Sequence, residues 1–291
     1  MNSICDPGDE VIIPEPFYAN YNGFALASDV NVIPITSKIE DNFALPSIHE
    51  FEKKINGKTR AILLCNPCNP TGYVYSQEEI TNIANLAKKN DLFIVVDEVY
   101  REFIYTDTKH FSILEDEKFS ENAILIDSIS KRYSLCGARV GFIVSKNSEF
   151  IDTCLKFALA RLSPPTLALI AANHALSSSE SYIKNVIREY YQRREVIIDE
   201  LSKIDNIKFS NPMGAFYSII KLPIENAEDF AKFLLTDFSY KNQSVMLSPA
   251  SGFYSSENYG KDEVRIAFVL NSEKLKNAIK IIKLGLKEFI G

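Results

Sequence analysis

The sequence predicts an α/β protein built on a mostly parallel β-sheet with helical crossovers, followed by a smaller α+β unit. Two observations carry this prediction. Short runs rich in β-branched residues alternate with segments of helical period in the first half of the chain, which is typical of parallel strands joined by crossover helices. The strand-like runs of the second half come after one long amphipathic segment.

The strand-like runs of the first half are short and apolar. They lie at residues 10–14, 30–35, 60–64, 92–97, 123–127 and 140–144. A helix is predicted over 76–90, because Ser76 and Glu79 have the spacing of a capping box ahead of apolar residues at helical intervals. We therefore expect one sheet with helices between its strands.

Apolar residues at helical spacing over 181–201 predict a long amphipathic helix with a charged outer face. We expect this helix to link two domains, a large one over 1–175 and a smaller one over 176–291. The strands and helices expected after it lie at 215–221, 226–236, 243–248, 263–269 and 273–289.

Composition excludes several classes of protein. The chain has 291 residues, of which 46% are hydrophobic and 24% charged, as in a folded globular protein. A net charge of -6, with lysines scattered among acidic residues, argues against a nucleic-acid partner. The amino terminus lacks the pattern of a signal peptide, and no apolar run reaches the length of a membrane span. We expect a cytoplasmic protein that binds neither nucleic acid nor membrane.

Cys65 and Cys68 have the CxxC spacing of a zinc or redox pair. The chain has no second such pair, and its three histidines do not cluster in sequence. We therefore expect no metal site. The two cysteines are interpreted as reduced thiols that are incidental to the turn at 66–72.

Polar residues follow three of the predicted strands. Ligands of open parallel sheets bind beyond the carboxyl ends of the strands, so these residues are expected to converge on one rim. They are Asp97, the stretch Ser128–Lys131 and the loop CNPCNPTG at 65–72.

Residues of these types can bind pyridoxal phosphate. A lysine in a cleft can lose its proton through desolvation and attack a carbonyl as a neutral amine. An aspartate can hold a cationic ring nitrogen, a tyrosine can bind a phenolate oxygen, and serines with an arginine can bind a phosphate. Taken singly, each residue has a plainer interpretation. The lysine could be a surface residue, the aspartate a helix cap and the tyrosine a packing aromatic, while the arginine could form a surface ion pair and the serines could be turn residues. The ordered set is what predicts the site.

Five motifs, in order, resemble the fold type I aminotransferases of class I/II, in particular the aspartate aminotransferase-like branch. They are NPCNPTG (66–72), DEVY (97–100), SISKRYSLCGARVG (128–141), GAFY (214–217) and EVRIAF (263–268). The resemblance covers essentially the whole chain. It implies the PLP-dependent transferase fold type I, pyridoxal 5'-phosphate as cofactor, and exchange of an amino group between an L-amino acid, with aspartate favoured, and a 2-oxo acid.

The resemblance also implies roles for single residues. Lys131 would form the internal aldimine and then act as general base and acid. Asp97 would keep the pyridinium nitrogen protonated. Tyr100 and Asn69 would bind the phenolate oxygen, and Asn69 would also contact substrate.

Further roles concern the phosphate, the ring face and the substrate. Ser128, Ser130 and Arg139 would contact the phosphate, with Arg139 as a bidentate partner. Tyr18 matches the aromatic residue that lies against the cofactor face, with an ordinary core aromatic as the alternative. Arg265 matches the clamp for the α-carboxylate of the substrate, with a surface ion pair as the alternative.

The sequence departs from the family at its start. Met1 stands just before DPGDEVIIPEP, which in the family follows a glycine-containing phosphate loop and a helix, so about the first quarter of the usual chain is expected to be missing and cofactor binding to be weaker. The alternatives are a truncated, catalytically weak or inactive cofactor-binding or dimerising remnant, or another fold type I chemistry such as a β-lyase or decarboxylase. The family also implies a homodimer.

Overall fold

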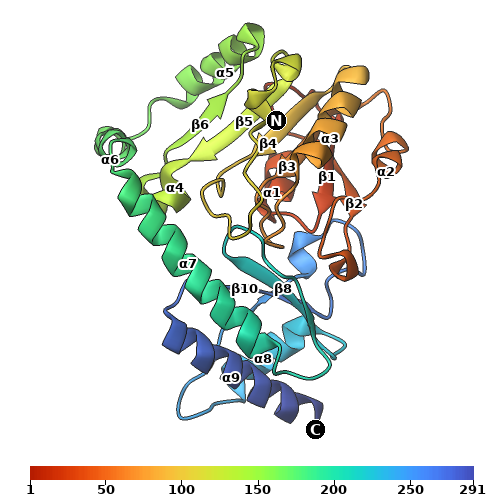
Figure 1. Ribbon diagram of the computed structural model, residues 1–291. Helices are drawn as coiled ribbons and strands as arrows, with labels where there is room; N and C mark the ends of the chain where they lie inside the picture. The colour runs from red at the N-terminus through yellow and green to blue at the C-terminus, as the bar shows by residue number, and fades with distance from the viewer.

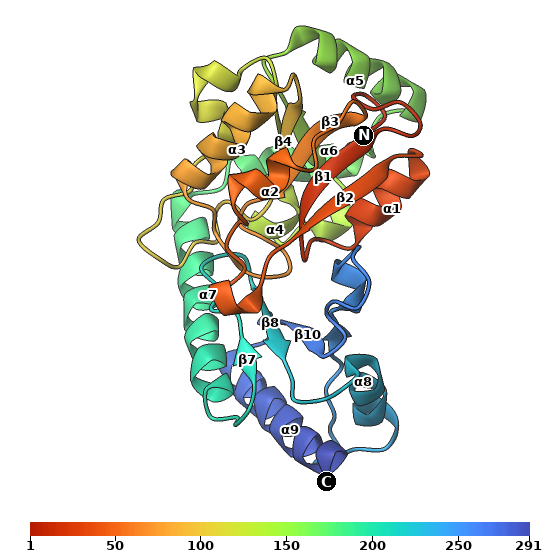
Figure 2. The same ribbon diagram turned by 90° about the vertical axis from the view of Figure 1, so that its right-hand side faces the viewer.

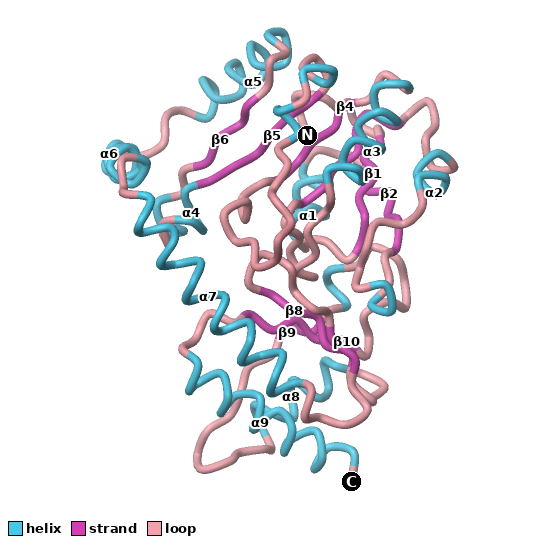
Figure 3. The backbone as a smooth tube through the Cα atoms, viewed as in Figure 1, coloured by secondary structure: helices cyan, strands magenta, loops and turns pink.

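Two β-sheets organise the chain, one in each half of the molecule (Figure 1). The structure is a computed structural model that describes residues 1–291. The first sheet has six strands in the order β2-β1-β3-β4-β5-β6, and the second has four in the order β7-β8-β10-β9. Figure 3 shows the two sheets as separate groups of strands with irregular chain between them.

The predicted mostly parallel sheet is confirmed. Strands β1 to β5 pair in parallel, and only β6 runs antiparallel to its neighbour β5. The strands are β1 (Glu10–Glu15), β2 (Asn31–Thr36), β3 (Thr59–Cys65), β4 (Phe93–Asp97), β5 (Ala123–Ser128) and β6 (Gly141–Val144).

Nine α-helices accompany the two sheets. They are α1 (Asn20–Ala27), α2 (Ile48–Glu52), α3 (Gln77–Lys89), α4 (Ile129–Arg132), α5 (Ser148–Arg161), α6 (Thr166–Leu176), α7 (Glu180–Leu201), α8 (Ala227–Thr236) and α9 (Ser272–Ile290). The helix predicted from the Ser76 capping box is confirmed as α3, and both halves of the box form: the Ser76 side chain accepts from Glu79 N, and the Glu79 side chain accepts from Ser76 N.

Both faces of the large sheet are covered, because alternate residues of each central strand enter opposite cores. In β3, Ile62 and Leu64 join the core beneath α2 and α3. Ala61 and Leu63 join the core that includes residues of α1 and α5. The unbroken apolar runs in the sequence reflect this burial on two sides.

The smaller sheet is antiparallel throughout. Its strands are β7 (Lys208–Phe209), β8 (Tyr217–Lys221), β9 (Ser248–Pro249) and β10 (Glu263–Ala267). The predicted strand over 243–248 is wrong except at its end, since only Ser248–Pro249 pairs with β10. Within 243–247 only Leu247 is buried. It enters the core of the smaller sheet, against which Val245 also packs, but no residue before Ser248 pairs with β10.

Helix α7 runs from the large sheet to the small one and lies against α9 (Figure 2). Its apolar side, including Ile197 and Leu201, enters the core of the smaller sheet. None of the helices combines the length and the apolar composition that a membrane span requires.

The capping box at α3 gives a testable contribution to stability. We expect Ser76→Ala to lower the free energy of unfolding by about 1 kcal/mol, because the backbone N–H of Glu79 loses its acceptor. Urea denaturation measures this change. Ser178→Ala, at an exposed position, is the matched control and should change stability much less; equal effects of the two substitutions would contradict the role of the cap.

Candidate functional site

The carboxyl ends of β3, β4 and β5 lie side by side. Cys65 pairs with Asp97, and Asp97 pairs with Ile126, in the registers of these three parallel strands. The segments that follow them therefore start from the same edge of the sheet, as expected for a ligand site in an open parallel sheet. This edge faces the smaller sheet (Figure 1).

Asp97 is held at the end of β4 by hydrogen bonds to both carboxylate oxygens. The hydroxyl of Tyr21, from α1, donates to Oδ2 at 2.8 Å, and the N–H of Val99 donates to Oδ1 at 3.2 Å. Burial raises the pKa of Asp97, because desolvation disfavours the charged form; the Tyr21 hydrogen bond and the charge of Lys131 oppose this rise. The carboxylate is thus placed where a cationic partner would stabilise it.

Lys131 lies on the short helix α4, directly after β5. Ser128 begins this helix, and its Oγ accepts from Ser130 N at 3.1 Å and lies 2.8 Å from the carbonyl oxygen of Val140. The Nζ of Lys131 lies 5.7 Å from the centre of the Tyr100 ring. Lys131, Asp97 and Tyr100 are therefore brought to one place by two adjacent strands.

A second group of residues links this rim to the smaller sheet. The hydroxyls of Tyr100 and Tyr217 are 2.9 Å apart. The guanidinium of Arg265 lies over the Tyr217 ring at 4.6 Å and over the Phe253 ring at 4.8 Å. Its Nη1 donates to Asn69 Oδ1 at 3.0 Å, whereas its buried Nε has no hydrogen-bond partner. Arg265 thus keeps a donor open between two aromatic rings.

Two predicted site residues, Tyr18 and Arg139, are exposed and make few contacts with the rest of the site. Tyr18 is 36% exposed and meets the Tyr21 ring edge-on at 5.5 Å between ring centres. Arg139 is exposed and has a left-handed backbone with φ of 57°. Its Nη1 donates to the carbonyl of Cys136 at 2.8 Å, so its guanidinium contacts its own turn instead of Ser128 or Ser130.

Sequence reasoning missed two tyrosines of the site, Tyr21 and Tyr217. Tyr21 stands three residues after Tyr18, a spacing that brings two side chains to the same side of a helical turn. Tyr217 is the last residue of the GAFY motif. Each binds a residue that the sequence did single out, Asp97 and Tyr100 respectively.

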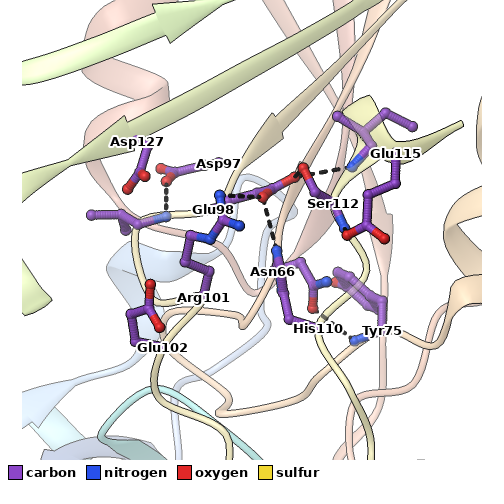
Figure 4. A network of polar contacts seen from close by, with 12 residues as sticks. Asn66, Tyr75, Asp97, Glu98, Arg101, Glu102, His110, Ser112, Glu115 and Asp127 are labelled. Carbon is purple, nitrogen blue, oxygen red and sulfur yellow. Dashed lines mark hydrogen bonds and ion pairs between the residues drawn. The ribbon is translucent and has the colours of Figure 1, made fainter. Parts of the chain in front are cut away.

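A buried glutamate fixes the segment after β4 (Figure 4). Glu98 is fully buried and accepts hydrogen bonds from Ser112 Oγ at 2.9 Å and Ile113 N at 3.1 Å. His110 Nε2 lies 2.8 Å from it and Arg101 Nη1 3.7 Å. Because four groups converge on this carboxylate, the chain between Asp97 and Tyr100 has little freedom. No local sequence pattern indicated this network.

The two cysteines of the loop are both buried. Burial is the main cause that raises the pKa of the Cys65 and Cys68 thiols. Both side chains are therefore neutral thiols near neutral pH and pack beneath the loop that carries Asn69.

The raised pKa of Asp97 predicts a pH-dependent effect on stability. The pKa of Asp97 in the folded chain lies above the ordinary value of 3.8. The stability that the protonated carboxyl contributes is therefore fully present below pH 3.8 and is lost as pH rises through the folded-state pKa. Asp97→Asn keeps a neutral side chain at every pH. We expect it to raise Tm near neutral pH, with a gap to the wild type that closes as pH falls toward 3.8.

Thermal unfolding followed by circular dichroism between acidic and neutral pH measures this gap. Asp205→Asn, at an exposed position, is the control and should give a small difference that does not vary in this way. A destabilised Asp97→Asn variant at neutral pH would show that the charged carboxylate is stabilising in the folded chain.

The sequence and the structure both match known proteins. The family model "Aminotransferase class I and II" matches residues 2–282. The chain is 32% identical to the aspartate aminotransferase of Pyrococcus horikoshii over 292 residues, which cover 99% of this chain and 72% of that relative.

Solved structures agree with this match. An aromatic aminotransferase from Pyrococcus horikoshii superposes with a TM-score of 0.89 at 28% identity, covering 99% of this chain and 76% of that one. An alanine aminotransferase from Pyrococcus furiosus superposes with a TM-score of 0.87 at 29% identity, covering 98% and 72%. The chain therefore belongs to the class I and II aminotransferase family and has its fold type I architecture.

Proposed function

We propose that the chain is a pyridoxal-phosphate-dependent aminotransferase that exchanges an amino group between an L-amino acid and a 2-oxo acid, with Lys131 as the reacting amine. One observation carries the proposal. A lysine, a carboxylate of raised pKa and a tyrosine hydroxyl meet at one edge of the sheet, where Lys131 Nζ lies 5.7 Å from the Tyr100 ring and its charge acts on Asp97.

The donors and acceptors at the site fit this cofactor. Asp97 offers a carboxylate whose burial makes a cationic ring nitrogen a favourable partner. The hydroxyl of Tyr100 and the amide of Asn69 are of the kind that binds a phenolate oxygen. Ser128 and Ser130 offer hydroxyls for a phosphate.

Arg139 is the phosphate residue that has to change partner. Its guanidinium donates to Cys136 in its own turn and is exposed, so it can exchange this bond for a phosphate oxygen at little cost. A charge-assisted bidentate pair is roughly twice as strong as a bond to a neutral carbonyl. We therefore assign Arg139 to the phosphate together with Ser128 and Ser130.

The residues divide the chemistry between them. When bound, the cofactor supplies an electrophilic aldehyde and a ring that accepts electrons. Lys131 provides the amine that holds the cofactor and moves a proton to and from the α-carbon of the substrate. Asp97, oriented by Tyr21, would keep the ring nitrogen protonated, and Tyr18, which meets the Tyr21 ring edge-on, would supply the aromatic ring against the cofactor face.

Arg265 is proposed to bind the substrate α-carboxylate. Its guanidinium lies between the rings of Tyr217 and Phe253, which hold the planar group in one orientation, and its Nε is free to donate. Asn69 accepts from the other side of the same guanidinium and thereby fixes its direction.

Aspartate is the first amino donor that we propose. The Pyrococcus horikoshii relative is named for aspartate, whereas the two superposed structures are named for aromatic and alanine substrates. A half-reaction screen with aspartate, glutamate, alanine and aromatic amino acids should yield the matching 2-oxo acid from aspartate most rapidly. Formation of pyruvate with loss of a side-chain group would instead indicate a β-lyase, and release of carbon dioxide a decarboxylase.

Removal of the reacting amine gives the most direct test of the site. We expect the wild-type chain to develop a visible absorbance band when pyridoxal phosphate is added, because the amine of Lys131 reacts with the aldehyde. Lys131→Ala removes this amine and should lack the band. Lys131→Arg keeps the charge but not the reactive amine and should also lack the band. Lys38→Ala, at an exposed lysine, should retain it; equal bands in all variants would place the reaction elsewhere.

Arg265 gives a second test at the substrate end of the site. We expect Arg265→Gln to weaken 2-oxo acid binding by roughly tenfold to a hundredfold, because a hydrogen bond between charged groups is lost. Fluorescence or calorimetric titration measures this change. Arg193→Gln is the matched control, because Arg193 also lies over an aromatic ring, that of Tyr190 at 4.8 Å, but is on α7; a similar loss in both variants would contradict the assignment.

A further inference from the structure

A buried carboxylate at the end of β1 joins the two halves of the molecule. Glu15 is the last residue of β1 and is 1% exposed. Its Oε1 accepts from Thr36 Oγ1 at 2.7 Å, and its Oε2 accepts from the backbone N–H of Ser255 at 2.7 Å and from that of Ser256 at 3.1 Å. Burial of a charge costs stability, and here three charge-assisted hydrogen bonds offset that cost.

The two serines belong to a segment of the smaller sheet. They lie in residues 250–256, which follow β9 and which we call the clamp loop. Ala250 N donates to the carbonyl of Glu263, in β10, at 2.8 Å, and the hydroxyl of Tyr254 donates to Glu263 Oε2 at 2.7 Å. The clamp loop is therefore fixed to β10 by one set of bonds and to β1 by Glu15.

The clamp loop carries one of the two rings that enclose the Arg265 guanidinium. Phe253 is 6% exposed, and its ring lies 4.8 Å from this guanidinium. The other ring, that of Tyr217, comes from β8 of the smaller sheet. Phe253 is two residues before Ser255, so a shift of the loop at Ser255 would displace the ring that orients Arg265.

Three groups of the large sheet and its α1 region hold the clamp loop by hydrogen bonds. Phe17 N donates to the carbonyl of Phe253 at 2.9 Å, and Ser255 Oγ donates to Asn22 Oδ1 at 2.7 Å in an exposed position. Glu15 is the third group and the only charged one. Hydrogen bonds to a charged group are roughly twice as strong as those between neutral groups. Glu15 is thus the strongest polar anchor of the loop on this side.

We infer that Glu15 is a positioning residue for substrate binding, which acts through the clamp loop and the Phe253 ring to hold Arg265 in the orientation that binds an α-carboxylate. The inference rests on the role proposed for Arg265. Glu15 itself touches neither substrate nor cofactor in this account. Its loss should therefore weaken the binding of a 2-oxo acid and leave the reaction of the Lys131 amine with the cofactor unchanged.

The first experiment titrates the chain, saturated with pyridoxal phosphate, with 2-oxoglutarate and with oxaloacetate. For the more tightly bound acid we expect Glu15→Ala to raise Kd about threefold to tenfold, because Arg265 must then be ordered at the moment of binding. The absorbance band that depends on Lys131 should be the same as in the wild type. Glu15→Gln keeps an acceptor oxygen for the loop and should raise Kd less than about twofold.

The matched control is a glutamate at the other end of the same strand. Glu10 begins β1 and accepts from Asn56 Nδ2 at 2.7 Å, away from the clamp loop. Glu10→Ala should leave Kd unchanged. A purely structural role of Glu15 would lower Tm without changing Kd, so thermal unfolding of each variant separates the two effects.

A second variant removes the same bond from the side of the loop. Ser255→Pro deletes the N–H that donates to Glu15, and the extended backbone of Tyr254, with φ of -113° and ψ of 142°, is the conformation favoured before proline. We expect this variant to raise Kd as Glu15→Ala does. It provides the measurement if Glu15→Ala does not fold, as judged by circular dichroism.

The second experiment tests the route through Phe253 with a double-mutant cycle. Phe253→Leu removes the ring beside Arg265 and should itself weaken binding. In that background Glu15→Ala should raise Kd less than about twofold further, because residues that act through one contact are not additive.

Two results would overturn the inference. Folded Glu15→Ala and Ser255→Pro chains could bind the 2-oxo acid as tightly as the wild type, or Glu15→Ala could have its full effect in the Phe253→Leu background. Failure of the proposed function has a different signature, because the wild type would then lack the absorbance band, or Arg265→Gln would bind the acid as well as the wild type does. Either of these results also removes the basis of the inference.

Discussion

The site depends on how the segment after β4 docks onto the smaller sheet. The N–H of Ala215 donates to the carbonyl of Phe103 at 2.9 Å, and Tyr105 N donates to Met213 O at 2.9 Å. The rings of Phe103 and Phe216 pack edge-on at 5.4 Å between centres. These contacts join the two sheets within a few residues of Tyr100, so the residues on the large sheet and those on the small sheet meet at a defined separation.

Polar groups at the site remain partly unsatisfied in this docked arrangement. Burial raises the pKa of Asp97, and Arg265 keeps a buried Nε without a partner. Both features cost stability in the chain alone. Packed residues such as Phe103 and the carboxylate of Glu98, held by His110 and Ser112, hold the site in this conformation, as is common where function requires local strain.

Much of the fold and part of the site could be predicted from the sequence. The central strands and helix α3 could be predicted, because unbroken apolar runs and a capping box are local signals. Asp97 and Lys131 could be predicted from the rule that ligands bind beyond the carboxyl ends of parallel strands, which lie on one edge of the sheet. Contacts between distant segments could not be predicted from local pattern. Tyr21 reaches Asp97 across 76 residues, and Tyr217 reaches Tyr100 across 117. Strand pairing near 243–248 is also a contact between distant segments, and it is limited to Ser248 and Pro249 against β10.

The central claim is that Lys131 is the amine at which the cofactor reacts. The most direct measurement is to incubate the chain with pyridoxal phosphate, reduce with borohydride, digest, and locate the modified lysine by mass spectrometry. The account predicts one modified peptide containing Lys131, at a stoichiometry that approaches one per chain as cofactor is raised. Modification spread over exposed lysines, or a single product at a lysine other than Lys131, would contradict it.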